Sequence, residues 1–297
     1  MKKAPNKETA VLTTVYPGVG KFLKDYFDSL EGQTSMEFDL LIANDKLDGL
    51  TSFLSDRNLN YLIIDVEGSP SSNRRELIRN AINSGYKKLI FSDSDDICEK
   101  NRVEIVSNLL DTSHIVVNDL NIVDNNGAEL KSMVFSERYD GTKKISLPDI
   151  LTGNMMGLSN TAVKAEVLQG CPALKTGDPI AFDWYLWSTL LLIGYEAKFT
   201  SETSTNYRIY DNNVAGLPQP LSEINVARGV EVKRQHYELM AKLDDLYSEL
   251  SHAFQDVNKR LKQKAWRKKY LNGLKKHAID NHIWWENIRT PAEVGIK

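Results

Sequence analysis

Short apolar runs alternate with helical patterns through the first hundred residues of the chain. Four runs rich in Val, Ile, Leu and Phe have the composition and length of buried β-strands. These runs are residues 10–17, 38–45, 60–66 and 87–93. Between them, residues 20–33 and 73–86 place apolar side chains at helical spacing, and Asn73 followed by Glu76 suggests that the second helix begins there. Strands that alternate with such helices predict parallel βαβ units in a sheet covered on both faces.

The pattern changes after residue 96. Residues 114–135 predict two strands around a turn at Asn126-Gly127, and residues 147–160 are rich in loop-forming residues. An apolar helix is predicted at 181–195, and a last strand followed by a polar loop at 197–213.

The remainder, from about residue 221, is predicted to be helical. Its apolar residues step by threes and fours and form one stripe, made of Leu243, Leu246, Leu250, Phe254, Val257 and Leu261. A stretch at 259–276 then holds nine basic residues and no acid, with Trp266 and Tyr270 between them. We therefore expect a main domain of residues 1–220 and a helical, basic extension of residues 221–297.

Charge is divided unevenly along the chain, whose formal net charge is −3. Residues 225–297 hold 15 Lys and Arg against 9 Asp and Glu, a net charge of +6, so residues 1–224 carry −9. This division favours two regions with different roles. The start of the chain lacks the apolar stretch of a secretory signal, and the apolar run 184–195 is too short to span a bilayer. Cys98 and Cys171 form neither a disulfide framework nor a metal-site spacing, so we expect a cytoplasmic protein, with peripheral membrane contact as an open alternative.

Residues 93–96, Asp-Ser-Asp-Asp, place three carboxylates at the end of the fourth predicted strand. Open α/β sheets bind ligands outside the carboxyl ends of their strands, so these acids, like Asp45 after the second strand, are expected at such a crevice. Carboxylates this close repel one another, and a bound cation relieves the repulsion. Carboxylate oxygens shared with phosphate and water suit Mg²⁺ or Mn²⁺. The alternative is a solvated acidic turn in which Asp95 or Asp96 caps a helix.

Asp183 lies at the start of the predicted apolar helix. A carboxylate in that position commonly caps the helix. Held against the neighbouring aromatic side chains, it could instead have a raised pKa and serve as a general base. Arg74 and Arg75 open a helix beside the crevice, and Arg208 lies near the end of the last strand. Arginine suits a diphosphate or the edge of a nucleobase, although it also occurs on any helix surface.

The order and spacing of these segments resemble the family 2 inverting glycosyltransferases, which have the GT-A fold. The resemblance covers roughly residues 10–215. It rests on "VLTTVYP", "FLKDYFDSLEGQT", "FDLLIANDKLDG", "AINSGYKKLIFSDSDD", "AFDWYLW" and "YRIYDNN". It implies a Rossmann-like mixed sheet flanked by helices, with a nucleotide-binding half at about 10–100, an acceptor half at about 101–215 and a C-terminal helical extension.

The resemblance also implies roles for individual residues. The donor nucleotide and its sugar would contact Thr14, Tyr16, Asp45, Arg74 or Arg75, Asp93 and Ser94. Asp95 would hold Mn²⁺ or Mg²⁺ on the diphosphate, and Asp183 would be the catalytic base. Further donor or acceptor contacts are expected at Asp96, Asn160, Trp184 and Arg208. Phe182 departs from the pattern, because the family often has Glu at this position.

Together these features predict a metal-dependent inverting glycosyltransferase. It would move a sugar from a nucleotide diphosphate, with UDP the commonest in the family, to a hydroxyl of a glycan or lipid-linked acceptor in surface polysaccharide or glycoconjugate synthesis. Two alternatives stay open. Phe182 supports a catalytically degenerate scaffold subunit. A sugar-1-phosphate nucleotidyltransferase uses a similar sheet, but it needs a Gly-rich basic loop that "YPGVGKF" does not match.

The C-terminal extension predicts partners of its own. Its apolar stripe favours packing against the main domain or against a second copy of the chain. Its basic and aromatic stretch suits anionic lipid near a lipid-linked acceptor. Nucleic acid is not expected as a partner, because the main domain is acidic.

Overall fold

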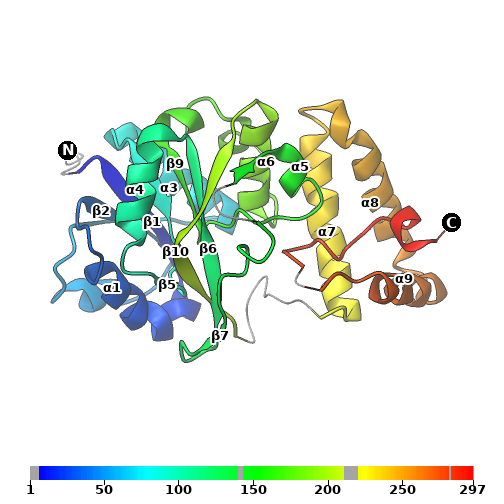
Figure 1. Cartoon of the computed structure of the whole chain (residues 1–297), viewed down its shortest axis with the longest axis horizontal. Coiled ribbons are helices and arrows are strands. Elements are labelled where there is room, and N and C mark those ends of the chain that lie inside the picture. The colour runs from blue at the N-terminus through cyan, green and yellow to red at the C-terminus, as the bar shows by residue number, and fades with distance from the viewer. Residues whose placement is uncertain (1–6, 140–142, 211–219, 281, 297) are drawn as a thin grey trace.

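The structure of the protein is a computed structural model that describes residues 7–139, 143–210, 220–280 and 282–296 (Figure 1). Its centre is a mixed β-sheet with the strand order β3-β2-β1-β4-β9-β6-β10-β5, in which β7 pairs with β6 and β8 with β10. The strands are β1 Thr9–Val15, β2 Phe38–Asn44, β3 Tyr61–Asp65, β4 Lys88–Phe91, β5 Ile97–Cys98, β6 Ile115–Val123, β7 Glu129–Lys131, β8 Lys144–Ile145, β9 Thr161–Lys164 and β10 Ala197–Arg208. The predicted mixed sheet flanked by helices is confirmed.

The first half of the chain forms the predicted parallel part of the sheet. Strand β1 runs parallel to β2 and β4, and β2 runs parallel to β3. The helical elements between these strands are η1 Pro17–Phe22, α1 Leu23–Glu31, α2 Leu50–Leu54 and α3 Pro70–Ser84. Successive strand residues point to opposite faces, so Val11 packs in the cluster that includes α1, while Leu12 packs in the cluster that includes α3. Both faces are therefore covered, as the near-continuous apolar strands require.

The start of α3 differs from the prediction. The helix begins at Pro70, and Ser69 caps it by accepting a hydrogen bond from the backbone N–H of Ser72 at 3.1 Å. A serine cap followed by proline is a favoured helix start, because the fixed φ of proline suits the first turn. The amide of Asn73 is thereby left for Asp45, to which its Nδ2 donates at 3.1 Å.

The second half of the sheet is largely antiparallel. Strand β9 lies between β4 and β6 and runs antiparallel to both. Strand β6 turns back into β7 at Asp124–Ala128, where Gly127 has a φ of 85°, so the predicted hairpin is confirmed. The helices of this half are α4 Arg102–Thr112, α5 Leu147–Ile150 and α6 Phe182–Leu192, with the short η2 Ala165–Leu168 and η3 Pro172–Leu174. The polar loop predicted after the last strand lies mainly in 211–219, outside the described residues.

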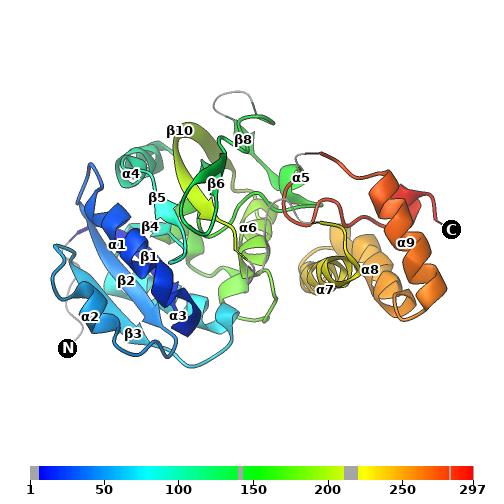
Figure 2. The ribbon, with the colours of Figure 1, turned by 90° about the horizontal axis from the view of Figure 1, so that it is seen from below.

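The C-terminal extension forms a group of helices beside α5 and α6, on the side away from β1, β2 and β3 (Figure 2). These elements are α7 Glu223–Met240, η4 Asp245–Tyr247, α8 Ser248–Arg260, α9 Lys264–Lys276 and η5 Ala292–Val294. Apolar residues of α7, α8 and α9 belong to the same buried cluster as α6. The tryptophan ring of Trp184 stacks on His236 of α7, with ring centroids 3.9 Å apart. The extension is thus packed against the main domain.

The predicted apolar stripe is only partly correct. Phe254, Val257 and Leu261 are buried, whereas Leu243 and Leu246 are exposed because they lie in the turn between α7 and α8. No described helix has the combination of length and apolar content that crossing a bilayer needs. Cys98 and Cys171 are buried free thiols.

Candidate active site

The acidic turn follows β4 at the carboxyl end of the sheet. The backbone N–H of Ser92 donates to Leu12 O at 3.0 Å, and the buried Ser94 hydroxyl donates to Thr14 O at 2.7 Å. The turn is therefore fastened to the end of β1. The side chain of Asp93 stays 33% exposed. This fastening places Asp93 beside the last residues of β1, where the parallel strands open into the crevice predicted from the topology.

Asp96 and Arg208 hold this turn from the protein interior. Asp96 is buried, and its carboxylate accepts hydrogen bonds from the backbone N–H of Arg208, at 2.8 Å, and from the Ser159 hydroxyl. The buried Arg208 guanidinium donates to Asp95 O at 2.9 Å and pairs with Asp25 at 3.0 Å. The structure therefore places Asp96 and Arg208 in the interior, where they fix the shape of the turn.

The raised pKa values of two carboxyl groups in the turn indicate that its acids repel one another. Burial raises the pKa of Asp93 to about 6, Arg74 opposes the rise, and Asp95 and Asp183 add to it. Burial, together with the neighbouring Asp95 and Asp93, raises the pKa of Asp96 well above its usual range. A bound cation would relieve this repulsion.

The ligand set left for such a cation consists of carboxylates. No cluster of three or more His, Cys, Asp or Glu side chains arranged to hold a metal occurs in the part of the chain described. Because Asp96 is committed to Ser159 and Arg208, Asp93 and Asp95 remain. Two carboxylates fit Mg²⁺ or Mn²⁺, which commonly share their coordination shell with substrate phosphates and water.

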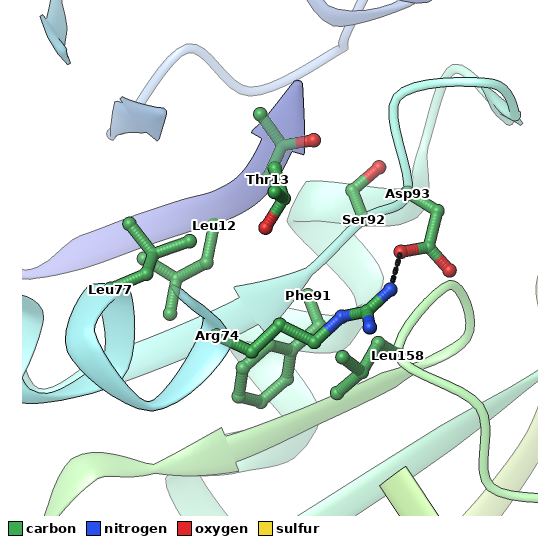
Figure 3. Close-up of a pocket in the computed structure, with 9 residues that line it drawn as sticks. Leu12, Thr13, Arg74, Leu77, Phe91, Ser92, Asp93 and Leu158 are labelled. Carbon is green, nitrogen blue, oxygen red and sulfur yellow. Dashed lines mark ion pairs between the residues drawn. The ribbon is translucent and has the colours of Figure 1, made fainter. Parts of the chain in front are cut away.

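Arg74 and Arg75 take different directions from α3. Arg74 extends into a small pocket, and its guanidinium lies 3.7 Å from Asp93 Oδ1 (Figure 3). The pocket is lined by Leu12, Thr13, Thr14, Arg74, Leu77, Phe91, Ser92, Asp93 and Leu158. Arg75 instead donates to Gly177 O and lies against the Phe182 ring, 5.9 Å from its centroid. Of the two arginines that the sequence left as alternatives, Arg74 is the one at the pocket.

A second group of side chains surrounds the ends of β1 and β2. The backbone N–H of Asp45 donates to Val15 O at 2.8 Å, and its side chain accepts from Asn73. Tyr16 is 39% exposed, and burial of the remainder raises its pKa, while a hydrogen bond with Tyr210 lowers it. The Tyr210 hydroxyl donates to Asp95 Oδ2 at 2.7 Å, so a chain of contacts joins Tyr16 to the acidic turn.

Asp183 occupies the first turn of α6 and is half-buried. It does not cap the helix, because the residue at the cap position is Ala181. Its Oδ1 accepts from the Trp184 backbone N–H at 2.8 Å, and its Oδ2 accepts from Asn154 Nδ2 at 3.1 Å. Burial raises the pKa of Asp183, against the opposing effect of these hydrogen bonds and of Arg74. Arg74 thus lowers the pKa of both Asp93 and Asp183, and the charge of Asp183 raises that of Asp93, so the three side chains interact electrostatically.

Two residues expected to contact a sugar, Trp184 and Asn160, lie in the protein interior. Trp184 is fully buried, and its indole N–H donates to Ile150 O at 2.7 Å. Asn160 is also fully buried, and its amide donates to Asn118 O and Met155 O at 3.0 and 3.1 Å. Both side chains stabilise the loop beneath the site and face the interior.

Three contributors to the site were not identified from the sequence. They are Asn73, Asn154 and Tyr210, which hold Asp45, Asp183 and Asp95 respectively. Tyr210 lies in the segment "YRIYDNN", from which only the arginine was singled out. The other two are polar residues in a helix and a loop, and nothing in the local sequence distinguishes them from surface amides.

No protein-family model and no curated protein matches the sequence. Solved structures do resemble it. S. aureus TarS 1–349 in complex with UDP-GlcNAc matches with a TM-score of 0.62 and 16% identity, over 91% of this chain and 76% of that one. Mannosyltransferase PcManGT from Pyrobaculum calidifontis, in complex with GDP-Man and Mn²⁺, matches with a TM-score of 0.53 and 12% identity, over 81% and 65%. The chain spans 46% of the longer TarS structure. At these identities the likeness establishes a shared fold. Both of these solved structures are complexes with a nucleotide sugar.

Proposed function

We propose that the protein is a metal-dependent inverting glycosyltransferase. The donor is a nucleotide diphosphate sugar, with UDP the favoured nucleotide, and the acceptor is a hydroxyl of a glycan or lipid-linked sugar in surface polysaccharide or glycoconjugate synthesis. One observation carries this proposal. Asp95 and Asp183, from the end of β4 and the start of α6, both raise the pKa of Asp93, and the Arg74 guanidinium lies 3.7 Å from Asp93 Oδ1 and opposes the rise.

The residues of the crevice divide into a donor side and an acceptor side. Tyr16, Asp45 and Thr14 would surround the nucleobase and ribose, and Arg74 would approach the diphosphate through its planar guanidinium. Asp95 would hold Mn²⁺ or Mg²⁺, with Asp93 beside it. When bound, the metal would supply positive charge to the departing diphosphate.

Asp183 would act as the general base. Its raised pKa and partial exposure suit proton transfer from an acceptor hydroxyl, because a base is most effective when its pKa is near the working pH. Removal of that proton as the hydroxyl attacks the anomeric carbon gives a single displacement with inversion. No covalent intermediate is needed, so one carboxylate suffices and Phe182 does not prevent the reaction.

Turnover assays with Mn²⁺ and a panel of UDP- and GDP-sugars test this function. Asp183→Asn should lower turnover ~10²- to 10⁴-fold while leaving donor binding unchanged. Asp56→Asn, at an exposed carboxylate after α2, is the matched control and should behave as wild type. If the wild-type protein transfers or hydrolyses no donor but binds a protein partner tightly through its C-terminal helices, the scaffold alternative holds instead.

The basic helix α9 leads to a proposal about location. Lys264, Lys268 and Lys275 are exposed and share one side of α9, which would suit the anionic face of a cytoplasmic membrane near a lipid-linked acceptor. Vesicles containing phosphatidylglycerol should float the wild-type protein and not the variant with all three lysines changed to Glu. Equal flotation of the two, or none with the wild type, would exclude this contact.

A homo-oligomer through the C-terminal helices stays a prediction. The exposed Leu243 and Leu246 are the apolar side chains that the turn between α7 and α8 offers to a second copy. Sedimentation of the wild type and of Leu246→Ser would decide it, since a dimer formed there should dissociate in the variant.

A further inference from the structure

The last part of the chain returns to the candidate active site. Residues 283–289, here called the strap, cross beside α7 and reach the loop between α5 and β9 (Figures 1 and 2). Trp284 forms an antiparallel β-bridge with Asn154, whose backbone N–H donates to Trp284 O at 3.0 Å. Residues 130 positions apart in the sequence are thus joined through their backbones.

The approach of the strap to this loop is close. A side chain at Gly153 would meet Glu286 Cβ at 3.0 Å and Trp284 O at 3.1 Å, so the absence of a Cβ permits the contact. Gly229 has the same role on α7, where a Cβ would lie 2.6 Å from Ile288 Cγ1. Trp285 adopts a left-handed φ of 68°, which is uncommon for a bulky residue and shows that its surroundings fix the turn.

Side chains of the main domain also hold the strap in place. Glu286 forms two hydrogen bonds with Arg138, at 2.8 and 2.9 Å, and the Arg138 guanidinium overcomes burial to hold the pKa of Glu286 below its usual range. The Trp284 ring packs against Tyr207 of β10 and against Phe135, with centroids 5.3 and 6.3 Å away. The strap is therefore fixed to β10 and to residues 135–138 as well as to the loop.

Asn154 connects the strap to the site. Its backbone pairs with Trp284, while its side chain donates to Asp183 Oδ2 at 3.1 Å and to Met156 O at 3.2 Å. Its Oδ1 in turn accepts from the Met156 N–H at 3.0 Å, which fixes the orientation of the amide. A shift of the strap would move the backbone of Asn154 and, with it, the donor that faces Asp183.

We propose that the strap and Asn154 are positioning elements for the reaction, which set the orientation of the Asp183 carboxylate toward the acceptor. This inference deepens the proposed function and rests on it. It gives the C-terminal extension a part in the site, in addition to its packing against the main domain. Arg74 from α3 lowers the pKa of Asp183, and the charge of Asp183 raises the pKa of Asp93 in the turn after β4.

Three variants of the full chain test the connection. Asn154→Ala removes the donor, and Asn154→Asp replaces it with a second carboxyl group beside Asp183 while keeping the acceptor for the Met156 N–H. Gly153→Ala leaves Asn154 unchanged but forces the strap away. Tyr86→Phe is the control, because it removes a buried hydrogen bond to Asp39 at the opposite end of the sheet.

The three variants should lower kcat about tenfold, with the KM for the donor within about twofold of wild type. Loss of a donor that stabilises the charged carboxylate should also move the acidic limb of the pH profile upward, by about half a unit to one unit. Tyr86→Phe should lower the melting temperature and leave both quantities unchanged. If Asn154→Ala or Gly153→Ala changes only the melting temperature, the inference is wrong.

A crystal structure of Gly153→Ala provides a measurement that does not depend on turnover. The strap should be displaced and the contact between Asn154 Nδ2 and Asp183 lost. A displaced strap with that contact intact would overturn the inference even if the wild-type enzyme is active. An inactive wild-type protein, in contrast, would refute the proposed function whatever this structure shows.

Discussion

Lys233 offers a quantitative test of how the C-terminal extension is joined to the main domain. It lies in α7, is 2% exposed, and donates from Nζ to Thr152 O at 2.6 Å. Burial lowers its pKa from 10.5 to about 7, although Glu293 and Glu286 oppose this. A shift of one pKa unit corresponds to about 1.4 kcal/mol, so burial of the charged form costs on the order of 5 kcal/mol.

The sign of the effect follows from proton binding. Between about pH 7 and pH 10.5 the unfolded chain keeps a proton on Lys233 that the folded chain has lost, so stability rises with pH in this window. Lys233 alone should contribute about 1.4 kcal/mol per pH unit there. Lys233→Met removes this contribution. It also leaves Thr152 O without its donor, at a cost of about 1–3 kcal/mol, so the net gain at pH 7 should be about 2–4 kcal/mol.

Urea unfolding at pH 7, 8 and 9 measures this dependence. The stability difference between Lys233→Met and wild type should shrink by roughly 2 kcal/mol from pH 7 to pH 9, because Lys233 is still half protonated in the folded chain at pH 7. Lys242→Met, at an exposed lysine just beyond α7, is the matched control and should show a constant difference. A difference for Lys233→Met that does not change with pH would refute the burial argument.

Four further variants test the candidate site and the residues that support it. Arg74→Ala should weaken UDP binding in calorimetry about tenfold or more. Arg75→Ala should lower the melting temperature and leave UDP affinity unchanged. Weaker UDP binding in Arg75→Ala but not in Arg74→Ala would exchange the two roles. Arg208→Ala should destabilise the fold by about 3–5 kcal/mol in urea unfolding, because it leaves buried partners unpaired, and a cost below 1 kcal/mol would contradict its bracing role. Tyr210→Phe should alter Mn²⁺ affinity by about fivefold or less without unfolding, since Asp95 keeps its charge; complete loss of Mn²⁺ binding would show that the hydroxyl itself is a ligand.

Much of the sheet could be predicted from local sequence because its strands are short, apolar and bounded by polar residues. Residues 87–93 end in Asp93, and β4 followed by the acidic turn is found there. The helix at 20–33 was recognisable because Leu23, Tyr26, Phe27 and Leu30 share one face, and these residues are buried in α1. Periodicity reports such local amphipathicity directly.

The directions of individual polar side chains could not be predicted in this way. Arg74 and Arg75 are adjacent, and their separation into pocket and surface contacts depends on Gly177, about 100 positions later. Tryptophan is a residue type that commonly stacks on sugars, but the ring of Trp184 is covered by His236 of α7. The connection from Trp284 through Asn154 to Asp183 depends entirely on contacts between distant segments, which leave no periodic signal.

We propose that Asp93 and Asp95 form a cation-dependent nucleotide site at the end of β4. Titration calorimetry of UDP into the protein, with Mn²⁺ and with EDTA, measures it most directly. Heat of binding is expected with Mn²⁺, its loss in EDTA, and at least a tenfold weaker affinity for Asp95→Asn. Binding of UDP that is equally strong in EDTA, or that Asp95→Asn leaves unchanged, would show that no cation held by these acids takes part in nucleotide binding.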